Sequence, residues 1–189
     1  MSKFRLIILD RDGVINQDSD SFIKTPEEWV AIPGSLEAIA RLCREDYRVV
    51  IITNQSGISR GLLSINTLNR IHQKMLEELA HFGGEISAIF FCPHGDKERC
   101  DCRKPAPGLF LKLSDRLNCD LRDVYAVGDS LRDIQAAHAA AANPVLVRTG
   151  KGEHTLETIR SENLEEEFGA IPVYPDLAAF VARLLQTPH

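Results

Sequence analysis

Short apolar runs alternate along this chain with segments of helical periodicity. The runs cover residues 4–9, 48–53, 87–91, 124–127 and 144–147. They are continuous rather than interrupted by polar residues at every second position, as in parallel strands that are covered on both faces. Because parallel strands need crossover helices, the pattern predicts a doubly wound, mostly parallel α/β sheet with right-handed connections.

The segments between the runs carry apolar residues at helical spacing. Ser35 is the predicted N-cap of one helix, whose apolar positions are Leu36, Ile39, Ala40 and Cys43. A second helix is predicted to start at Ser64 and to end at 83–84, and its apolar positions are Leu68, Ile71, Met75, Leu79 and Phe82. Further helices are predicted at about 107–117, after Asp129 and at about 175–186. Since no repeat or linker interrupts the pattern, residues 1–189 are predicted to form a single domain.

Composition narrows the class of protein. The chain is 44% hydrophobic and 26% charged, which is typical of a globular protein. Its formal net charge of −5, without a long basic run, disfavours a nucleic-acid partner. No apolar run approaches the roughly 20 residues of a membrane span, and the first run lacks the cleavage site of a signal peptide. We therefore expect a cytoplasmic monomer without a nucleic-acid or membrane partner.

Three of the predicted strands end in polar residues, in the sequences LDRDG, TNQSG and GDSLRD. In an open α/β sheet the functional site lies beyond the carboxyl ends of the strands. The charges of Asp10 and Asp12 would repel one another unless a cation lay between them, and Asp129 could complete an oxygen cage for a divalent ion. One Asp after a strand is usually a helix cap or turn residue. Three such aspartates, together with Thr53 and Lys104 in similar positions, indicate a functional site.

The stretch CPHGDKERCDCRKP holds three of the five cysteines of the chain. Cys92, His94, Cys100 and Cys102 suit one tetrahedral Zn²⁺ ion, and four protein ligands leave no open position, so the metal would be structural. Disulfides are disfavoured by the expected compartment and by the odd number of cysteines, and unliganded buried cysteines are the remaining alternative. A zinc clip would fix the loop that leads into Arg103 and Lys104.

The sequences DRDG, TN, RKP and GDSLRD, in this order, resemble the four motifs of the haloacid dehalogenase (HAD) superfamily of phosphohydrolases. The resemblance covers essentially the whole chain. It implies a Rossmann-like core in which Asp10 attacks phosphorus and forms an aspartyl-phosphate. It also implies that Asp12 acts first as general acid and then as general base, while Thr53 and Lys104 hold the phosphoryl group.

The same resemblance implies a catalytic Mg²⁺ held by Asp10, the backbone carbonyl of Asp12 and Asp129. Ser130 would add its carbonyl, although some superfamily members have lysine at this position and its role is left open. Asp133 would orient Lys104 or a metal-bound water, unless it is a surface residue of the following helix.

Neither residues 13–49 nor residues 57–104 leave room for a cap domain, so we expect an open cleft. Its walls would be residues 18–22, residues 55–61 and the zinc loop. The residues expected to bind substrate are Arg11, Asp18, Ser19, Asp20, Ser21, Asn54, Gln55, Ser56, Arg60 and Arg103.

The zinc-loop sequence is similar to that of a zinc-containing, histidinol-phosphatase-like branch of the superfamily. This resemblance implies a phosphorylated sugar substrate, a heptose 1,7-bisphosphate that loses its C7 phosphate, with histidinol phosphate as the alternative. TNQSGISRG favours the sugar, because the histidinol-phosphate enzymes have an acidic residue where Ser56 stands. Arg60 and Arg103 are candidates for the second phosphate. A non-enzymatic zinc-stabilised module would leave the strand-end carboxylates unexplained, and a nucleic-acid 3′-phosphatase is disfavoured by the acidic balance.

Overall fold

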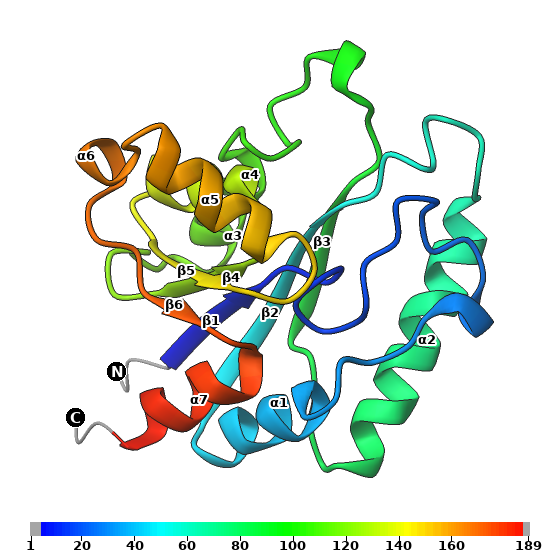
Figure 1. The fold of residues 1–189 in the computed structure, drawn as a ribbon. Helices are drawn as coiled ribbons and strands as arrows, with labels where there is room; N and C mark the ends of the chain where they lie inside the picture. Colours follow the sequence, from blue (N-terminus) through cyan, green and yellow to red (C-terminus); the bar gives the residue numbers. More distant parts are fainter. Residues whose placement is uncertain (1–4, 187–189) are drawn as a thin grey trace.

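The computed structural model describes residues 5–186 and contains a parallel sheet of six strands in the order β3-β2-β1-β4-β5-β6 (Figure 1). The strands are β1 (Arg5–Leu9), β2 (Tyr47–Asn54), β3 (Ala88–Cys92), β4 (Tyr125–Gly128), β5 (Asn143–Val147) and β6 (Val173–Tyr174). The chain adds strands on one side of β1 and then on the other, so β1 and β4 flank a topological switch point. The predicted doubly wound sheet is confirmed.

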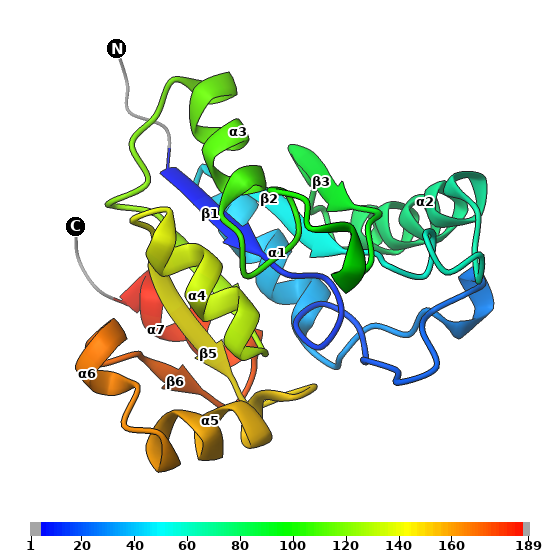
Figure 2. The same ribbon diagram turned by 90° about the horizontal axis from the view of Figure 1, so that it is seen from above.

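Helices cover both faces of the sheet (Figure 2). The cluster under α1 (Ser35–Arg44), α2 (Ile65–His81) and α7 (Leu177–Gln186) is separate from the one under α3 (Gly108–Leu117) and α4 (Leu131–Ala139). In β1, Ile7 and Leu9 belong to the first cluster and Leu6 and Ile8 to the second. Because successive side chains of a strand point to opposite faces, two covered faces require the continuous apolar run that the sequence shows.

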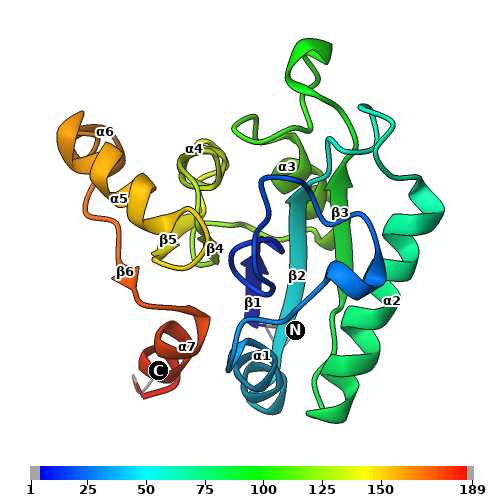
Figure 3. The same ribbon diagram turned by 45° about the vertical axis from the view of Figure 1, so that its right-hand side comes forward.

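The segment between β1 and α1 passes beside α2 (Figure 3). It contains the 3₁₀ turn η1 (Pro26–Glu28), and Lys74 of α2 donates hydrogen bonds to the carbonyls of Pro26 and Trp29 at 3.0 Å each. Residues 5–186 contain no cap domain, as the sequence predicts. Among the helices of this range, none has both the length and the apolar composition that crossing a membrane requires.

Two details of the helix predictions are wrong. Ser35 is the first residue of α1 rather than its cap, and its hydroxyl donates instead to the carbonyl of Ile15 at 2.7 Å. Gly34, with φ of +82°, occupies the N-cap position. Phe82 caps the C-terminus of α2 and is 41% exposed, so it does not belong to the buried face of that helix.

The sequence pattern also missed β6, α5 (Gly152–Ser161) and α6 (Glu165–Phe168). β6 has only two residues, which is too short for a periodicity to appear. Three of the four residues of α6 are glutamates, and α5 mixes charged residues with few apolar ones. These elements take their structure from packing against β5 and α4 rather than from a strong local signal.

Candidate active site

A cavity of about 230 Å³ lies beyond the carboxyl ends of β1, β2 and β4. It is lined by most of the residues that the sequence predicts for the site: Asp10, Asp12, Asp18, Ser19, Asp20, Thr53, Asn54, Gln55, Ser56, Arg60, Arg103, Lys104, Asp129 and Ser130. The side chains of Arg11 and Ser21 do not line it. The strand ends thus bring together motifs that lie more than 100 residues apart in the sequence.

Lys104 is enclosed by acidic and carbonyl oxygens. Its Nζ lies 3.0 Å from Asp10 Oδ1 and 2.5 Å from Asp133 Oδ1, and it donates to the carbonyl of Ile52 at 2.8 Å. The residue is only 3% exposed. Although burial alone would lower its pKa, the two carboxylates raise the pKa of Lys104 above its usual value, so the ammonium charge is permanent.

The carboxylate oxygens of Asp10, Asp129 and Asp133 lie within 4.8 Å of one another. Burial, reinforced by Asp133 and Asp12 against the attraction of Lys104, raises the pKa of Asp10 to about 7. Burial and the charges of Asp133 and Asp10 raise the pKa of Asp129 to about 8. One ammonium cannot balance three carboxylates, and this set of oxygen donors fits a hard divalent ion such as Mg²⁺.

Two glycines confine the carboxylate of Asp129. Gly13 has φ of +81° and Gly150 has φ of +57°, and a Cβ atom at either position would lie 2.0 or 2.1 Å from Asp129 Oδ2. The same oxygen accepts a hydrogen bond of 2.7 Å from the backbone N–H of Lys151. The carbonyl of Asp129 accepts from the Thr155 hydroxyl at 2.8 Å. Asp129 therefore has little freedom to move.

Asp133 is 6% exposed and pairs with Lys104, so it is not a surface residue of α4. Its Oδ2 accepts from the backbone N–H of Ser130 at 3.0 Å and from the Ser130 hydroxyl at 2.5 Å. Asp133 thus caps the N-terminus of α4 while it holds the lysine. The hydroxyl of Ser130 is committed to this cap, which leaves its carbonyl as the group predicted to bind Mg²⁺.

Asn54, at the end of β2, fixes the backbone of Lys104. Its side-chain amide donates to the Lys104 carbonyl at 3.0 Å and accepts from the Lys104 N–H at 3.1 Å. Neighbouring Gln55 donates to Thr53 Oγ1 at 3.0 Å and to Asp12 Oδ2 at 2.9 Å. Asn54 and Gln55, which are predicted to contact substrate, thus also hold three residues that are predicted to be catalytic.

Asp12 lies in a network of donors. Besides Gln55, it accepts a hydrogen bond from Asn16 Nδ2 at 2.9 Å and a bidentate pair from Arg11. Burial opposes ionisation, but Arg11 and these hydrogen bonds prevail and hold the pKa of Asp12 below its usual value. The Arg11 side chain is turned away from the cavity and does not line it, so the structure does not bring it to the predicted substrate contact.

The four predicted zinc ligands converge. The sulfur atoms of Cys92, Cys100 and Cys102 lie 3.1–3.6 Å from one another. His94 Nδ1 lies 3.5 Å from the sulfur of Cys92 and 3.2 Å from that of Cys102. A zinc ion with sulfur at about 2.3 Å and nitrogen at about 2.0 Å would separate its ligands by roughly 3.5–3.8 Å. The cluster therefore fits a tetrahedral Zn²⁺ ion, as predicted.

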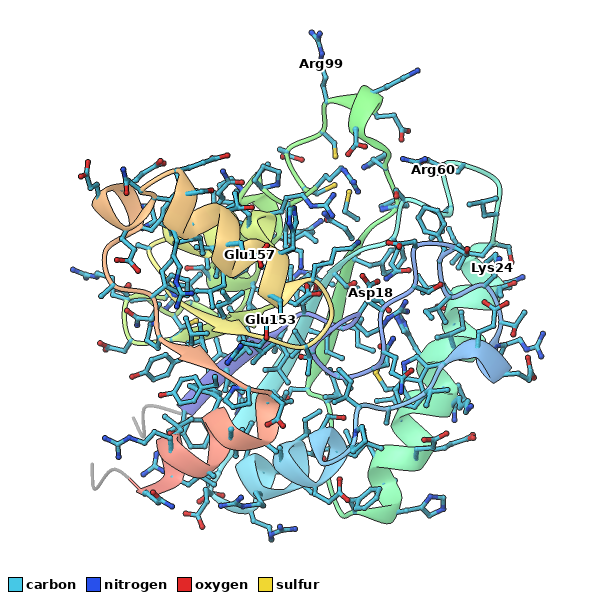
Figure 4. All side chains as sticks on the ribbon, in the orientation of Figure 1. Asp18, Lys24, Arg60, Arg99, Glu153 and Glu157 are labelled. Carbon is cyan, nitrogen blue, oxygen red and sulfur yellow. The ribbon has the colours of Figure 1, made fainter. Side chains whose placement is uncertain are left out.

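The zinc loop also holds Arg103. Its guanidinium contacts Asp96 Oδ1 through Nε and Nη2, both at 2.7 Å, and donates through Nη1 to the carbonyl of His94 at 3.3 Å. Arg60, labelled in the upper part of Figure 4, lies 3.7 Å from the other oxygen of Asp96. Its guanidinium lies over the ring of Phe22. Two cations from different loops thus meet at the rim of the cavity.

Sequence reasoning missed four residues that line the cavity: Ile23, Asp96, Arg132 and Lys151. Lys151 lies 3.1 Å from Asp18, in the region where Figure 4 shows Asp18 beside the loop after β5. A signal existed for Lys151, because it follows the carboxyl end of the fifth apolar run. No comparable signal marked Asp96, which stands among other exposed charged residues, whereas Arg132 lies within the sequence GDSLRD but was not singled out.

The parallel sheet and the acidic site at its switch point define a HAD-type hydrolase, and the comparisons with known proteins agree. A family model described as HAD-hydrolase-like matches residues 101–179. D-glycero-β-D-manno-heptose-1,7-bisphosphate 7-phosphatase from Bordetella bronchiseptica is 53% identical over 186 residues, which cover 96% of this chain and 98% of the relative. The enzyme of the same name from Pseudomonas aeruginosa is 48% identical over 181 residues, with 96% and 98% covered.

Solved structures give the same result. A crystal structure of the B. bronchiseptica D,D-heptose 1,7-bisphosphate phosphatase, complexed with magnesium and phosphate, matches with a TM-score of 0.89 over 96% of this chain and 98% of that chain. The corresponding phosphatase from Burkholderia thailandensis is 44% identical, with a TM-score of 0.72 over 97% and 99%. The chain belongs to the D-glycero-β-D-manno-heptose-1,7-bisphosphate 7-phosphatase family.

Mg²⁺ binding is predicted to strengthen as the pH rises. Without metal, the pKa values of about 7 for Asp10 and about 8 for Asp129 mean that these groups bind protons at pH 6, and Mg²⁺ must displace them. Each proton displaced changes the affinity by up to about tenfold per pH unit. Isothermal titration in buffers of different ionisation enthalpy should show proton release and at least about tenfold tighter binding at pH 8 than at pH 6. Binding that is independent of pH would contradict this.

The zinc cluster predicts one tightly bound zinc per chain. Cys100→Ser or Cys102→Ser should lower zinc content and solubility, and should reduce activity by about tenfold or more, because the loop that positions Lys104 loses its clip. The Mg²⁺ requirement should not change. Cys119→Ser, a cysteine outside the cluster, is the matched control. Elemental analysis that finds no zinc in protein purified without chelator would contradict the prediction.

Proposed function

We propose that this chain is a Mg²⁺-dependent phosphatase that removes the C7 phosphate of D-glycero-β-D-manno-heptose 1,7-bisphosphate. The observation that carries the proposal is the site itself: three clustered carboxylates and Lys104 below an open cavity, with Arg60 and Arg103 at its rim. The names of the 53% and 48% identical relatives supply the sugar and its anomer.

In the first half-reaction, a carboxylate oxygen of Asp10 attacks the phosphorus of the C7 phosphate. A bond forms between that oxygen and phosphorus, and the bond between phosphorus and the C7 oxygen breaks. The pKa of Asp12 is held low in the free site, so Asp12 takes up a proton when the phosphate anion binds beside it and raises that pKa. Asp12 passes this proton to the departing oxygen, so that the sugar leaves as an alcohol. Lys104 Nζ, 3.0 Å from Asp10, stabilises the negative charge that develops on the phosphoryl oxygens.

In the second half-reaction, Asp12, now a carboxylate, takes a proton from a water molecule that attacks the same phosphorus. The bond between phosphorus and Asp10 breaks, which returns the free carboxylate and releases inorganic phosphate. Asp10, Asp129 and the carbonyl of Asp12 would hold Mg²⁺, with Ser130 adding its carbonyl, and the ion supplies positive charge that offsets the repulsion between carboxylate and phosphate. Thr53, buried beside Gln55, is proposed to donate its hydroxyl to a phosphoryl oxygen.

The rim of the cavity supports a bisphosphate substrate. Among the ion pairs of residues 5–186, Arg60 and Arg103 share the single carboxylate of Asp96, so a second phosphate would bring the additional negative charge that these two cations can pair with. Ser56, where the histidinol-phosphate enzymes have an acidic residue, lines the cavity as a neutral group. The remaining proposed substrate contacts are the side chains of Asp18, Ser19, Asp20, Asn54 and Gln55, which line the cavity, whereas Arg11 and Ser21 do not line it.

This reaction would serve the synthesis of nucleotide-activated heptose for lipopolysaccharide. We also propose a single-domain monomer located in the cytoplasm. Size-exclusion chromatography with light scattering tests the monomer, limited proteolysis tests the single domain, and cell fractionation tests the location.

Substitution of the nucleophile is predicted to abolish turnover without unfolding the protein. Asp10→Asn replaces a carboxylate with an amide, which is a poor nucleophile and a weaker ligand for Mg²⁺. Asp12→Asn should also be severe, since both proton transfers lose their carrier. Phosphate release and thermal unfolding measure the two effects, and Asp115→Asn on the exposed side of α3 is the control. Substantial turnover by Asp10→Asn, after deamidation is excluded, would contradict the covalent mechanism.

The substrate proposal is tested with heptose 1,7-bisphosphate, heptose 7-phosphate and histidinol phosphate. A charge-assisted hydrogen bond contributes about 1.5–3 kcal/mol, so one arginine on the second phosphate should give a tenfold to hundredfold preference, roughly, for the bisphosphate in kcat/KM. Arg103→Ala should narrow this preference. Arg99→Ala is the matched control, because Arg99 lies on the same loop and points away from the molecule in Figure 4. Higher kcat/KM for histidinol phosphate would overturn the proposal.

A further inference from the structure

A chain of buried groups connects α2 with the carboxylate of Asp12. Arg11 donates from Nε and Nη2 to Asp12 Oδ1 at 3.1 and 2.9 Å, and from Nη2 to Oδ2 at 3.0 Å. On the other side of the guanidinium, Nη1 lies 3.2 Å from His72 Nε2. Arg11 is 1% exposed and His72 is 7% exposed, so neither contact competes with bulk water.

The direction of the contact between Arg11 and His72 is fixed by chemistry. A guanidinium has only N–H groups and cannot accept a hydrogen bond, so His72 Nε2 must be the acceptor. The imidazole is therefore neutral, with its hydrogen on Nδ1. Burial, and then the positive charge of Arg11, lower the pKa of His72 to about 4, which agrees with a neutral ring at physiological pH.

The position of His72 on its helix is unusual. It lies on the buried face of α2 among Leu68, Ile71, Met75 and Leu79, and its ring meets Phe91 of β3 edge to face at 6.4 Å. An apolar residue would pack at this position just as well. It would leave the Nη1 hydrogens of a buried cation without the acceptor that His72 provides, which is costly for a charged donor.

We propose that His72 is a positioning residue that acts through Arg11 to hold the carboxyl group of Asp12 in the orientation needed for proton transfer to the leaving oxygen. The inference deepens the proposed function, because it assumes that Asp12 is the acid of a phosphatase. Gln55, which lines the cavity, and the buried Asn16 each donate one hydrogen bond to the carboxylate, and Arg11, backed by His72, holds it from the protein interior. A rigid helix thereby sets the geometry of an otherwise loop-borne acid.

The test depends on the leaving group. Departure of a sugar alkoxide requires a proton, whereas p-nitrophenolate departs readily without one. His72→Leu should lower kcat/KM for heptose 1,7-bisphosphate about tenfold and for p-nitrophenyl phosphate less than about threefold. His72→Gln, whose amide oxygen reaches the position of Nε2, should recover most of the lost activity. His81→Leu, at the exposed end of the same helix, should leave kcat/KM unchanged for both substrates.

Each outcome decides between roles. Equal losses on both substrates, or no recovery in His72→Gln, would mean that His72 only supports the fold, and would overturn the proposal. If His72→Leu does not fold, His72→Asn takes its place, since its shorter amide cannot reach Arg11 and should show the same selective loss. Failure of the unmodified enzyme on heptose 1,7-bisphosphate would overturn the proposed substrate instead, and the comparison is then made between p-nitrophenyl phosphate and an alkyl phosphate that the enzyme hydrolyses.

Discussion

The repulsion among three buried carboxylates is the constraint on which the rest of this structure depends. Asp10, Asp129 and Asp133 crowd the switch point between β1 and β4, and within residues 5–186 their one ion-pair partner is Lys104, which contacts Asp10 and Asp133. Such an arrangement is stable only if every member is held and a cation completes it. The glycines around Asp129, the cap on α4 and the amide clamp of Asn54 are the means by which the fold holds these groups.

Lys104 poses the hardest problem of placement, because it follows a long polar loop instead of a strand. A loop of this kind has no apolar core to order it, and an error of one ångström would take the ammonium away from Asp10. The structure meets this problem at both ends. Cys92 is the last residue of β3 as well as a predicted zinc ligand, and Asn54 bonds both backbone groups of Lys104. Metal and sheet together replace the missing core.

The sequence predicts the residues that follow strands far better than those that act through packing. Asp10, Thr53 and Asp129 were predictable because parallel strands deliver their carboxyl ends to one edge, and the zinc ligands because their spacing is distinctive. The pairing of Arg11 with His72 was not predictable, because it joins positions 61 residues apart and depends on how α2 packs against the sheet. For the same reason Arg11, predicted as a substrate contact, turns its side chain inward. The short β6 and the glutamate-rich α6 lacked any periodic signal.

The zinc cluster divides the loop into two parts: the part that leads into Lys104, which the cluster fixes, and the crest, residues 96–99, which lies between the ligands His94 and Cys100. Residues 96–99 are exposed and lie at the highest point of the molecule in Figure 1, whereas Lys104, two residues after the last cysteine of the cluster, is buried. The crest can therefore change in length or charge without disturbing the lysine. Through Asp96, which holds Arg103, such changes would alter which anions the rim attracts. This division makes substrate choice evolvable independently of the hydrolytic chemistry, within a single loop.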